Sequence, residues 1–258
     1  MFFLHISKKS TNFVAYLMFN SKIQNRKNMK KSIFLALMLL SGMICRADVE
    51  LASGSLSALK TSGEYAYVEI DWSKAKVVEF DRSGKVEKNK GSVDAYNKSQ
   101  GSDWVRDWPE VKRFITNCTA WEKYPGRACF NRKNKKGVLI TVNPEVWRAY
   151  QNCKDEDERE DMQDHCIWVN PAKAKYKFVL TVDQVDMGSG TASAFGVGVS
   201  SGGAIICGKI RLIEIKTGKQ LALINVDHCK GFGNYSQRTR LMDCVVGEIF
   251  GDLGDLVD

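Results

Sequence analysis

The fold is decided by Ala204-Ile-Ile-Cys-Gly-Lys-Ile-Arg-Leu-Ile-Glu-Ile215, which a Lys-Thr-Gly-Lys turn joins to Leu221-Ala-Leu-Ile-Asn-Val226. Two runs rich in aliphatic and β-branched residues on either side of a glycine turn predict a β-hairpin. Apolar residues fall on both faces near the turn, which favours a place in the centre of a sheet. Before the hairpin, Lys175–Asp183 predicts another strand, and after it the apolar stripe from Tyr235 to Val257 predicts a closing helix.

Strand and helix patterns also alternate in the first part of the chain. Glu64–Trp72 alternates, with even-numbered residues facing inward, and Gly137–Val142 is a short apolar run; both predict strands. Asp107-Trp-Pro-Glu110 has the form of a capping box, and Asn143-Pro144 pairs a cap with a first-position proline, so each predicts a helix start. Residues 81–102 predict a loop with a helical turn. The predicted fold class is α+β: a mixed, largely antiparallel sheet with helices packed on it and a closing C-terminal helix.

Residues 29–47 have the pattern of a signal peptide. A basic start precedes an apolar run over residues 32–44 that is too short to span a bilayer comfortably. Small residues occupy both positions that a signal peptidase reads in Cys45-Arg-Ala47, so cleavage is predicted near Ala47-Asp48. Isoleucine in front of Cys45 argues against lipidation of that cysteine. The predicted location is therefore the periplasm or the cell envelope.

Setting the leader apart also fixes the bounds of the predicted domain and the net charge of the exported part. We interpret residues 1–28 as an upstream extension and residues 48–258 as a single domain without a membrane span. Eight of the 38 basic residues, and none of the 30 acidic ones, lie in residues 1–47, so the exported part is formally neutral. The basic isoelectric point thus gives no indication of a nucleic-acid partner.

Seven of the eight cysteines follow the leader, and an exported chain can oxidise them. Because seven is odd, at least one stays free or pairs with another chain. Two pairs would each close a local loop, Cys118 with Cys129 and Cys153 with Cys166.

The pairing of the last three cysteines depends on the register of the hairpin. A two-residue turn at Thr217-Gly218 places Cys207 opposite His228 and turns Cys229 to the other side of the sheet, where it can meet Cys244 on the last helix. A one-residue slip would instead place Cys207 opposite Cys229. We favour the tight turn, so the disulfide candidates are Cys118, Cys129, Cys153, Cys166, Cys229 and Cys244.

No pattern of catalytic or metal-binding residues is convincing. The possible zinc ligands are Cys153, His165, Cys166, His228 and Cys229, but none forms a spaced pair, and neighbours on a strand point apart. The acidic run over residues 154–161 departs from a calcium loop and is typical of a solvated helix face. We therefore predict no cofactor, no metal and no catalytic residue. The alternative is a metal-dependent or cysteine-dependent hydrolase that uses His165 and His228.

A glycine-rich segment over residues 188–203 separates the strand at Lys175–Asp183 from the central hairpin. In it Phe195, Val197 and Val199 alternate with small residues, which predicts a strand with one apolar and one nearly bare face. A bare face allows close packing inside the protein. Alternatively, the three apolar side chains bind a partner, for which an envelope protein is the candidate.

The last third resembles exported bacterial domains similar to the amino-terminal domain of TolB and to the curli-secretion lipoprotein. The matching features are the strand at Tyr176–Val185, the glycine-rich approach, Glu214-Ile-Lys-Thr-Gly218, Lys230-Gly-Phe-Gly233 and the closing helix. The resemblance implies a mixed sheet with helices packed on it. It also implies an envelope protein that binds or assembles and does not catalyse a reaction.

Overall fold

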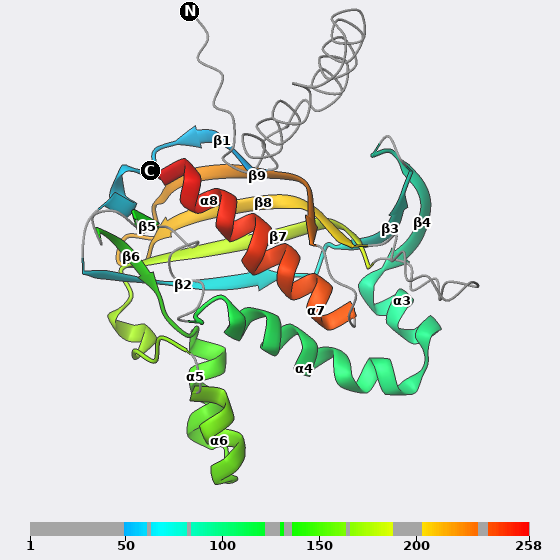
Figure 1. Ribbon diagram of the computed structural model, residues 1–258, viewed down its shortest axis with the longest axis horizontal. Helices are drawn as coiled ribbons and strands as arrows, with labels where there is room; N and C mark the ends of the chain where they lie inside the picture. The colour runs from blue at the N-terminus through cyan, green and yellow to red at the C-terminus, as the bar shows by residue number, and fades with distance from the viewer. Residues whose placement is uncertain are drawn as a thin grey trace, which may run out of the picture. The chain divides into compact units, whose positions relative to one another are not determined.

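The predicted hairpin lies in the middle of the sheet in the computed structural model (Figure 1). Strand β8 (Ala204–Glu214) pairs antiparallel with β9 (Gln220–Gly231) on one side and with β7 (Tyr176–Asp186) on the other. All three strands predicted for the last third of the chain are therefore confirmed.

The structure describes residues 49–60, 63–81, 84–121, 130–131, 136–163, 166–187, 203–231 and 237–257. They belong to one compact unit, residues 47–258. Several predictions lie outside the described residues, namely those on residues 1–28 and 29–47, on the Ala47-Asp48 cleavage point, and on Cys45, Cys129, His165, Phe195, Val197 and Val199. Among the described helices, none combines the length and the apolar character that a membrane crossing needs.

The sheet is mixed, as predicted. Within the described residues it has nine strands, in the order β1-β9-β8-β7-β2-β6-β5, with β3 paired to β7 and β4 paired to β3. Strand β2 runs parallel to both of its neighbours, β7 and β6, whereas β1 and β8 flank β9 antiparallel. The bounds of the remaining strands are β1 Val49–Gly54, β2 Glu64–Asp71, β3 Lys76–Phe80, β4 Val86–Ser92, β5 Phe130–Asn131 and β6 Lys136–Ile140.

Helices cover one face of the sheet. The closing segment, α7 (Gln237–Met242), a π-helical stretch (Asp243–Ile249) and α8 (Phe250–Val257), crosses β7, β8 and β9, and α4 (Ser102–Cys118) lies beside it (Figure 1). The remaining helices are α3 (Val93–Gln100), α5 (Pro144–Asn152) and α6 (Glu156–Gln163), with short 3₁₀ turns at Ser57–Lys60 and Pro171–Lys173. The α+β class is confirmed.

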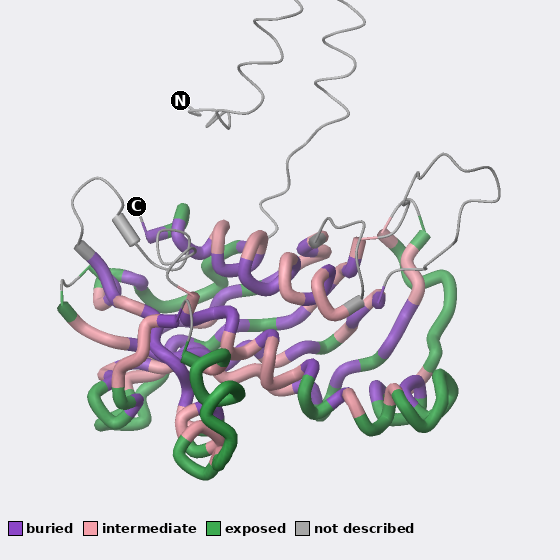
Figure 2. The backbone as a smooth tube through the Cα atoms, turned by 60° about the horizontal axis from the view of Figure 1, so that its bottom comes forward, coloured by how far each residue is buried: buried purple, intermediate pink, exposed green. Residues whose placement is uncertain are grey.

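The core lies between the closing segment and the central strands. Alternate residues of β8 are buried, and the buried class follows the middle of the sheet in Figure 2. Each large aliphatic side chain stabilises the fold by about 1.5–3 kcal/mol when it is fully buried. The fully buried members are Phe178, Leu180, Ile206, Ile210, Leu212 and Ile224 from the strands and Leu241, Val245, Ile249, Phe250 and Leu253 from the closing segment.

Two local predictions upstream of the core are wrong. Helix α4 starts at Ser102, so Pro109 lies inside the helix and Asp107 is not its cap. Trp104 stabilises the part of α4 that precedes Asp107. Its indole N–H donates to the Asn97 side chain, and its ring packs against Trp108. Within residues 81–102 the predicted helical turn is confirmed, because α3 begins at Val93 and Ser92 caps it by accepting a hydrogen bond from the Ala95 amide. The loop prediction is wrong for Val86–Ser92, which form β4.

Cys207 lies beside His228 as predicted, but the turn that was expected to set this register is different. The turn is longer than Thr217-Gly218, because the Glu214 amide bonds to the Lys219 carbonyl at 2.9 Å. Two irregularities then shift the pairing, the second between Ile206 and Gly208. Cys207 therefore does lie beside His228, while the buried Cys229 pairs with Ile206 and faces the helices.

Gly208→Ala tests the close approach of β7 and β8. A Cβ at Gly208 would lie 2.2 Å from the Thr181 carbonyl oxygen, whereas one at Gly251 in α8 meets nothing within 4 Å. We expect Gly208→Ala to lower the free energy of unfolding in urea by about 2–3 kcal/mol. Gly251→Ala, the control, should leave it equal or raise it by up to about 1 kcal/mol. Equal stabilities would contradict this packing.

Candidate functional site

A cleft of about 400 Å³ lies where β2 ends. Its walls are the last residues of β2 and those that follow it, the first turn of α3, the middle of α4 and the start of α5. The ends of parallel strands, where helices begin, are a common place for ligands in mixed sheets. The polar and aromatic residues that line the cleft include Glu69, Asp71, Trp72, Ser73, Ser92, Asp94, Trp108, Lys112, Arg113, Thr116, Asn143 and Glu145.

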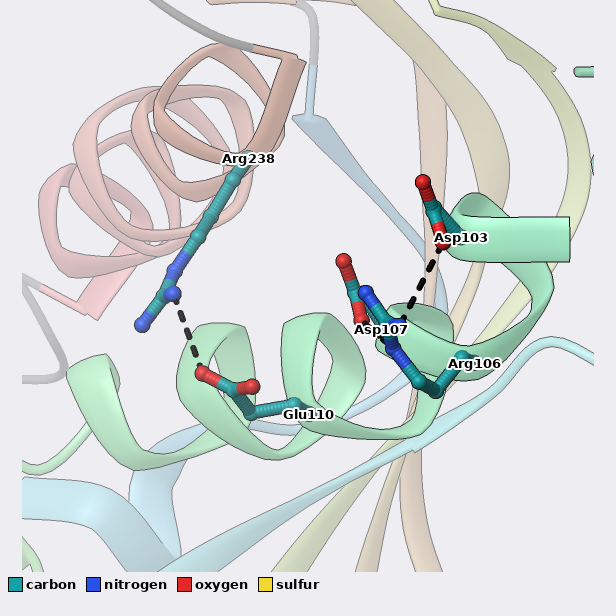
Figure 3. Close-up of polar contacts among 5 residues, drawn as sticks. All are labelled: Asp103, Arg106, Asp107, Glu110 and Arg238. Atoms are coloured by element: carbon teal, nitrogen blue, oxygen red, sulfur yellow. Dashed lines mark hydrogen bonds and ion pairs between the residues drawn. The ribbon is translucent and has the colours of Figure 1, made fainter. Parts of the chain in front are cut away.

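Helix α4 supplies the two cations of the cleft. Lys112 and Arg113 are half-buried, and among the described residues neither side chain has a hydrogen-bond or ion-pair partner. Arg106 on the same helix differs, because it bonds Asp103 at 3.3 Å and Asp107 at 2.9 Å (Figure 3). Half-buried cations without a partner lose hydration and gain nothing in return, so they favour an anionic group from outside.

The carboxylates of the cleft have different surroundings. The hydroxyl and the backbone N–H of Ser73 hold the pKa of Asp71 below its usual value, and the N–H bond measures 2.9 Å. Glu69 accepts from Lys177 of β7 at 3.0 Å. Asp94 and Glu145 are exposed. Asp71 is thus held in its ionised form, ready to accept hydrogen bonds from a ligand.

Asn143 fixes the start of α5 at the edge of the cleft. Its side-chain oxygen accepts from the Val146 amide at 2.8 Å, which confirms the predicted cap. Its side-chain nitrogen donates to the carbonyl of Val68 in β2 at 3.2 Å. The side chain is buried, so these two bonds tie the helix to the sheet.

Two tryptophans form the apolar wall of the cleft. Trp72 and Trp108 meet edge to face with ring centroids 5.5 Å apart, and both are buried. The indole N–H of Trp72 has no hydrogen-bond partner among the described residues. A buried donor without a partner costs stability. The NMR signal of this indole N–H therefore reports on changes at this wall of the cleft.

A second cluster lies where β8 and β9 part from regular pairing. The ligand atoms of Cys207, Asp227 and His228 all lie within 4.8 Å of one another. Nδ1 of His228 lies 2.6 Å from Oδ1 of Asp227, and its Nε2 lies 2.8 Å from the carbonyl oxygen of Gly84. The backbone N–H of His228 donates to the sulfur of Cys207 at 3.4 Å.

The β-bulge explains how neighbouring residues reach one place. Gly208 pairs with Val226 and Ile206 with Cys229, so both Asp227 and His228 lie opposite Cys207. His228 has a φ of 53°, and the edge of its ring meets Phe80 with centroids 4.7 Å apart.

Cys207 is not an activated thiol. Burial raises its pKa to about 11, and the charges of Asp227 and Asp183 add to the rise. An activated cysteine needs the opposite shift and a ring nitrogen within reach. Here both ring nitrogens of His228 face oxygen atoms, and the sulfur meets the backbone N–H instead.

No predicted disulfide is shown: the described cysteines, Cys118 and Cys207 among them, are thiols, and Cys129 lies outside the described residues. The thiol of Cys153 bonds to Glu158 and that of Cys166 to Asn117, so they have different partners. Cys244 does lie against Cys229, where its thiol donates to the Cys229 carbonyl at 2.9 Å. The prediction that Cys229 and Cys244 lie side by side is confirmed, and a disulfide between them stays a prediction.

The other predicted site residues are spread over the structure. The acidic run forms α6, which buries no residue and has the solvated face expected of it. Of the five possible zinc ligands, Cys153, Cys166 and Cys229 lie apart from the cluster that contains His228.

No family model matches the chain, and no curated protein matches it. Among solved structures, the PelC dodecamer from Paraburkholderia phytofirmans is 12% identical, with a TM-score of 0.31 over 80% of this chain and 96% of that one. A PelC variant from the same organism is 13% identical, with a TM-score of 0.30 over 80% and 94%. At these values the likeness carries no argument about function, and the resemblance to TolB stays a prediction.

Sequence reasoning missed both sites for identifiable reasons. Lys112 and Arg113 look like ordinary surface residues until α4 is placed across the end of β2. Asp227 was missed because alternation puts it on the opposite face from His228, and only the bulge brings them together. The available signal was the predicted pairing of Cys207 with His228.

Asn143→Ala should lower the free energy of unfolding by about 2–3 kcal/mol, because it removes a cap and a buried bond to β2. The matched control is Asn170→Ala, at the second Asn-Pro pair. Asn170 is exposed, and among the described residues its side chain makes only the cap bond to the Ala172 amide, so its loss should cost about 1 kcal/mol or less. Equal losses in urea unfolding would refute the role of the bond to Val68.

Asp71 predicts a pH dependence of stability. Its folded pKa lies below the ordinary value of 3.8, so the bonds from Ser73 stabilise the folded state above that pH. The contribution is lost as the pH falls through the lowered folded pKa. Urea midpoints of the wild type and Asp71→Asn should therefore differ by a constant amount above about pH 5 and converge at lower pH. A gap that widens on acidification would contradict the assignment.

Proposed function

We propose that this chain is an exported, non-catalytic binding module whose ligand occupies the cleft at the end of β2. The ligand is a small polar molecule with an anionic group that Lys112 and Arg113 bind. The single observation that carries the proposal is that these two half-buried cations have no partner among the described residues. Export rests on the leader pattern of residues 29–47.

The rest of the cleft suits binding by several polar contacts. Asp71 and Asp94 accept hydrogen bonds from hydroxyl or amino groups of the ligand, while the rings of Trp72 and Trp108 exclude water from one side. A volume of about 400 Å³ is within the range of small-molecule sites. The anionic group is therefore one end of a ligand that also carries hydrogen-bond donors.

Binding rather than catalysis is favoured by the state of the carboxylates. A general acid needs a raised carboxyl pKa, whereas that of Asp71 is lowered by Ser73. The cysteine-dependent form of the hydrolase alternative needs His228 to activate a thiol, and its ring nitrogens already face Asp227 and Gly84. Among the described residues no contact favours that form.

The test is a titration of the isotope-labelled protein with three classes of small anion: carboxylates, phosphate esters and acidic sugars. The indole N–H signals report on the cleft, since Trp72 and Trp108 line it and Trp147 packs elsewhere on Trp168. We expect at least one class to shift the first two signals in a saturable way and to leave that of Trp147 in place.

Variants on α4 identify the binding residues. Replacing both Lys112 and Arg113 by glutamine should weaken binding ten-fold or more, the equivalent of about 1.4 kcal/mol, because charged hydrogen bonds are lost. Arg106→Gln changes the same helix charge by one but removes a cation that Asp103 and Asp107 already neutralise, so affinity should hold. A panel without any shift, or shifts that survive the double substitution, would refute the proposal.

A further inference from the structure

The cluster of Cys207, Asp227 and His228 combines three kinds of metal ligand. A thiol, a carboxylate and an imidazole lie with their ligand atoms within 4.8 Å of one another, on the side of the sheet opposite the buried Cys229. About 34% of the His228 side chain and 47% of the Asp227 side chain are exposed, so an ion can reach them from solvent. A sulfur, nitrogen and oxygen donor set suits zinc and its neighbours more than calcium or magnesium.

The hydrogen bonds of His228 decide which ring nitrogen faces the cluster. A backbone carbonyl only accepts, so Nε2, at 2.8 Å from the Gly84 oxygen, carries a hydrogen. That leaves Nδ1 to face the Asp227 carboxylate at 2.6 Å. Metal-binding histidines commonly donate their second N–H to a backbone carbonyl in this way, which fixes the ring and the tautomer.

Two acceptors this close require a cation between or beside them. The lone pair of Nδ1 and the oxygen of Asp227 would repel each other unless a proton or a metal ion is present. The bulge sets this arrangement in the backbone, with His228 at a φ of 53° and its ring against Phe80. A left-handed residue that is not glycine is uncommon and is typical of functional positions.

We propose that Cys207, Asp227 and His228 bind a divalent ion of the zinc type through Sγ, a carboxylate oxygen and Nδ1. A tetrahedral zinc ion holds its ligand atoms roughly 3.4–3.6 Å apart, given Zn–S of about 2.3 Å and Zn–N and Zn–O of about 2.0–2.2 Å. The three ligand atoms already lie within 4.8 Å of one another, and Nδ1 and the Asp227 oxygen, now 2.6 Å apart, would move apart to admit the ion. The fourth position is open to water or to a group from another molecule.

The charges and protons of the site balance. Binding of M²⁺ replaces the hydrogen of the Cys207 thiol, which leaves as H⁺ to the buffer, and adds one thiolate and one carboxylate to the ion. Imidazole stays neutral, so the metal and its three protein ligands carry no net charge. A neutral complex is compatible with the half-buried position of Cys207, and no oxidant or reductant is required.

Cobalt titration of the full chain tests the site. The protein is kept reduced with a phosphine, stripped with a chelator and titrated with Co²⁺, whose thiolate complexes absorb in the near ultraviolet. We expect a charge-transfer band that saturates at one equivalent and disappears when Zn²⁺ displaces Co²⁺. Ring NMR signals should show Zn²⁺ on Nδ1 of one histidine, with its Nε2–H retained.

Substitutions then assign the ligands. Cys207→Ser should abolish the band, and Asp227→Asn should weaken Co²⁺ binding by about ten-fold or more. His228→Asn should do the same without a folding defect, since asparagine tolerates a positive φ. The matched control is Cys153→Ser, which removes a different thiol, one that bonds to Glu158, and should leave the band unchanged.

Three outcomes would overturn the proposal. The first is a wild-type protein without a saturable band. The second is a band that persists in Cys207→Ser or vanishes in Cys153→Ser. The third is zinc on Nε2, because Gly84 then cannot accept the hydrogen bond that orients the ring.

Discussion

Burial of one face of β7, β8 and β9 under the closing segment is the constraint on which the rest of the molecule depends. It fixes which side chains of β8 face the helices, Ile206 and Ile210 among them, and therefore sends Cys207 to the other side. It also places α7 beside α4, where Arg238 bonds Glu110 at 3.2 Å (Figure 3). The guanidinium of Arg238 lies 3.6 Å from the centre of the Phe114 ring. Helix α4 is thereby held across the end of β2, with Lys112 and Arg113 at the cleft.

The mixed sheet creates two kinds of local environment. Where strands run parallel, as at β2, a strand end and the first turns of α3 and α5 enclose a cleft. Where strands run antiparallel, as at β8 and β9, a bulge turns adjacent residues to one side and brings Asp227 and His228 onto Cys207. The two candidate sites therefore arise from different features of one sheet.

Local sequence patterns correctly predicted the strands and the helix that bury one face in the core. The hairpin, the strand before it, the closing helix and the Asn143 cap are all strong local patterns, and the structure contains them. Predictions were wrong where distant contacts override local preference. Pro109 lies inside α4, where the ring of Trp108 packs edge to face on the distant Trp72, a contact that no capping pattern encodes.

Neither site could be predicted from spacing alone, for physical reasons. The cleft requires the crossing of α4 over β2, which depends on long-range packing and not on local sequence. The cluster requires a departure from strict alternation, and a one-residue bulge has no dependable signature in an aliphatic strand. What the sequence did carry was the pairing of Cys207 with His228, since that follows from register counting.

The bulge in β9 also has an evolutionary consequence. It contains one residue more than the facing stretch of β8, and regular pairing resumes on the turn side at Gly208 and Val226 and continues to Leu212 and Ala222. Insertion or deletion of a single codon here changes which side chains meet Cys207, while the core faces of both strands keep their pattern. A single inserted or deleted codon can therefore change the side chains beside Cys207 without changing how the sheet packs on the helices.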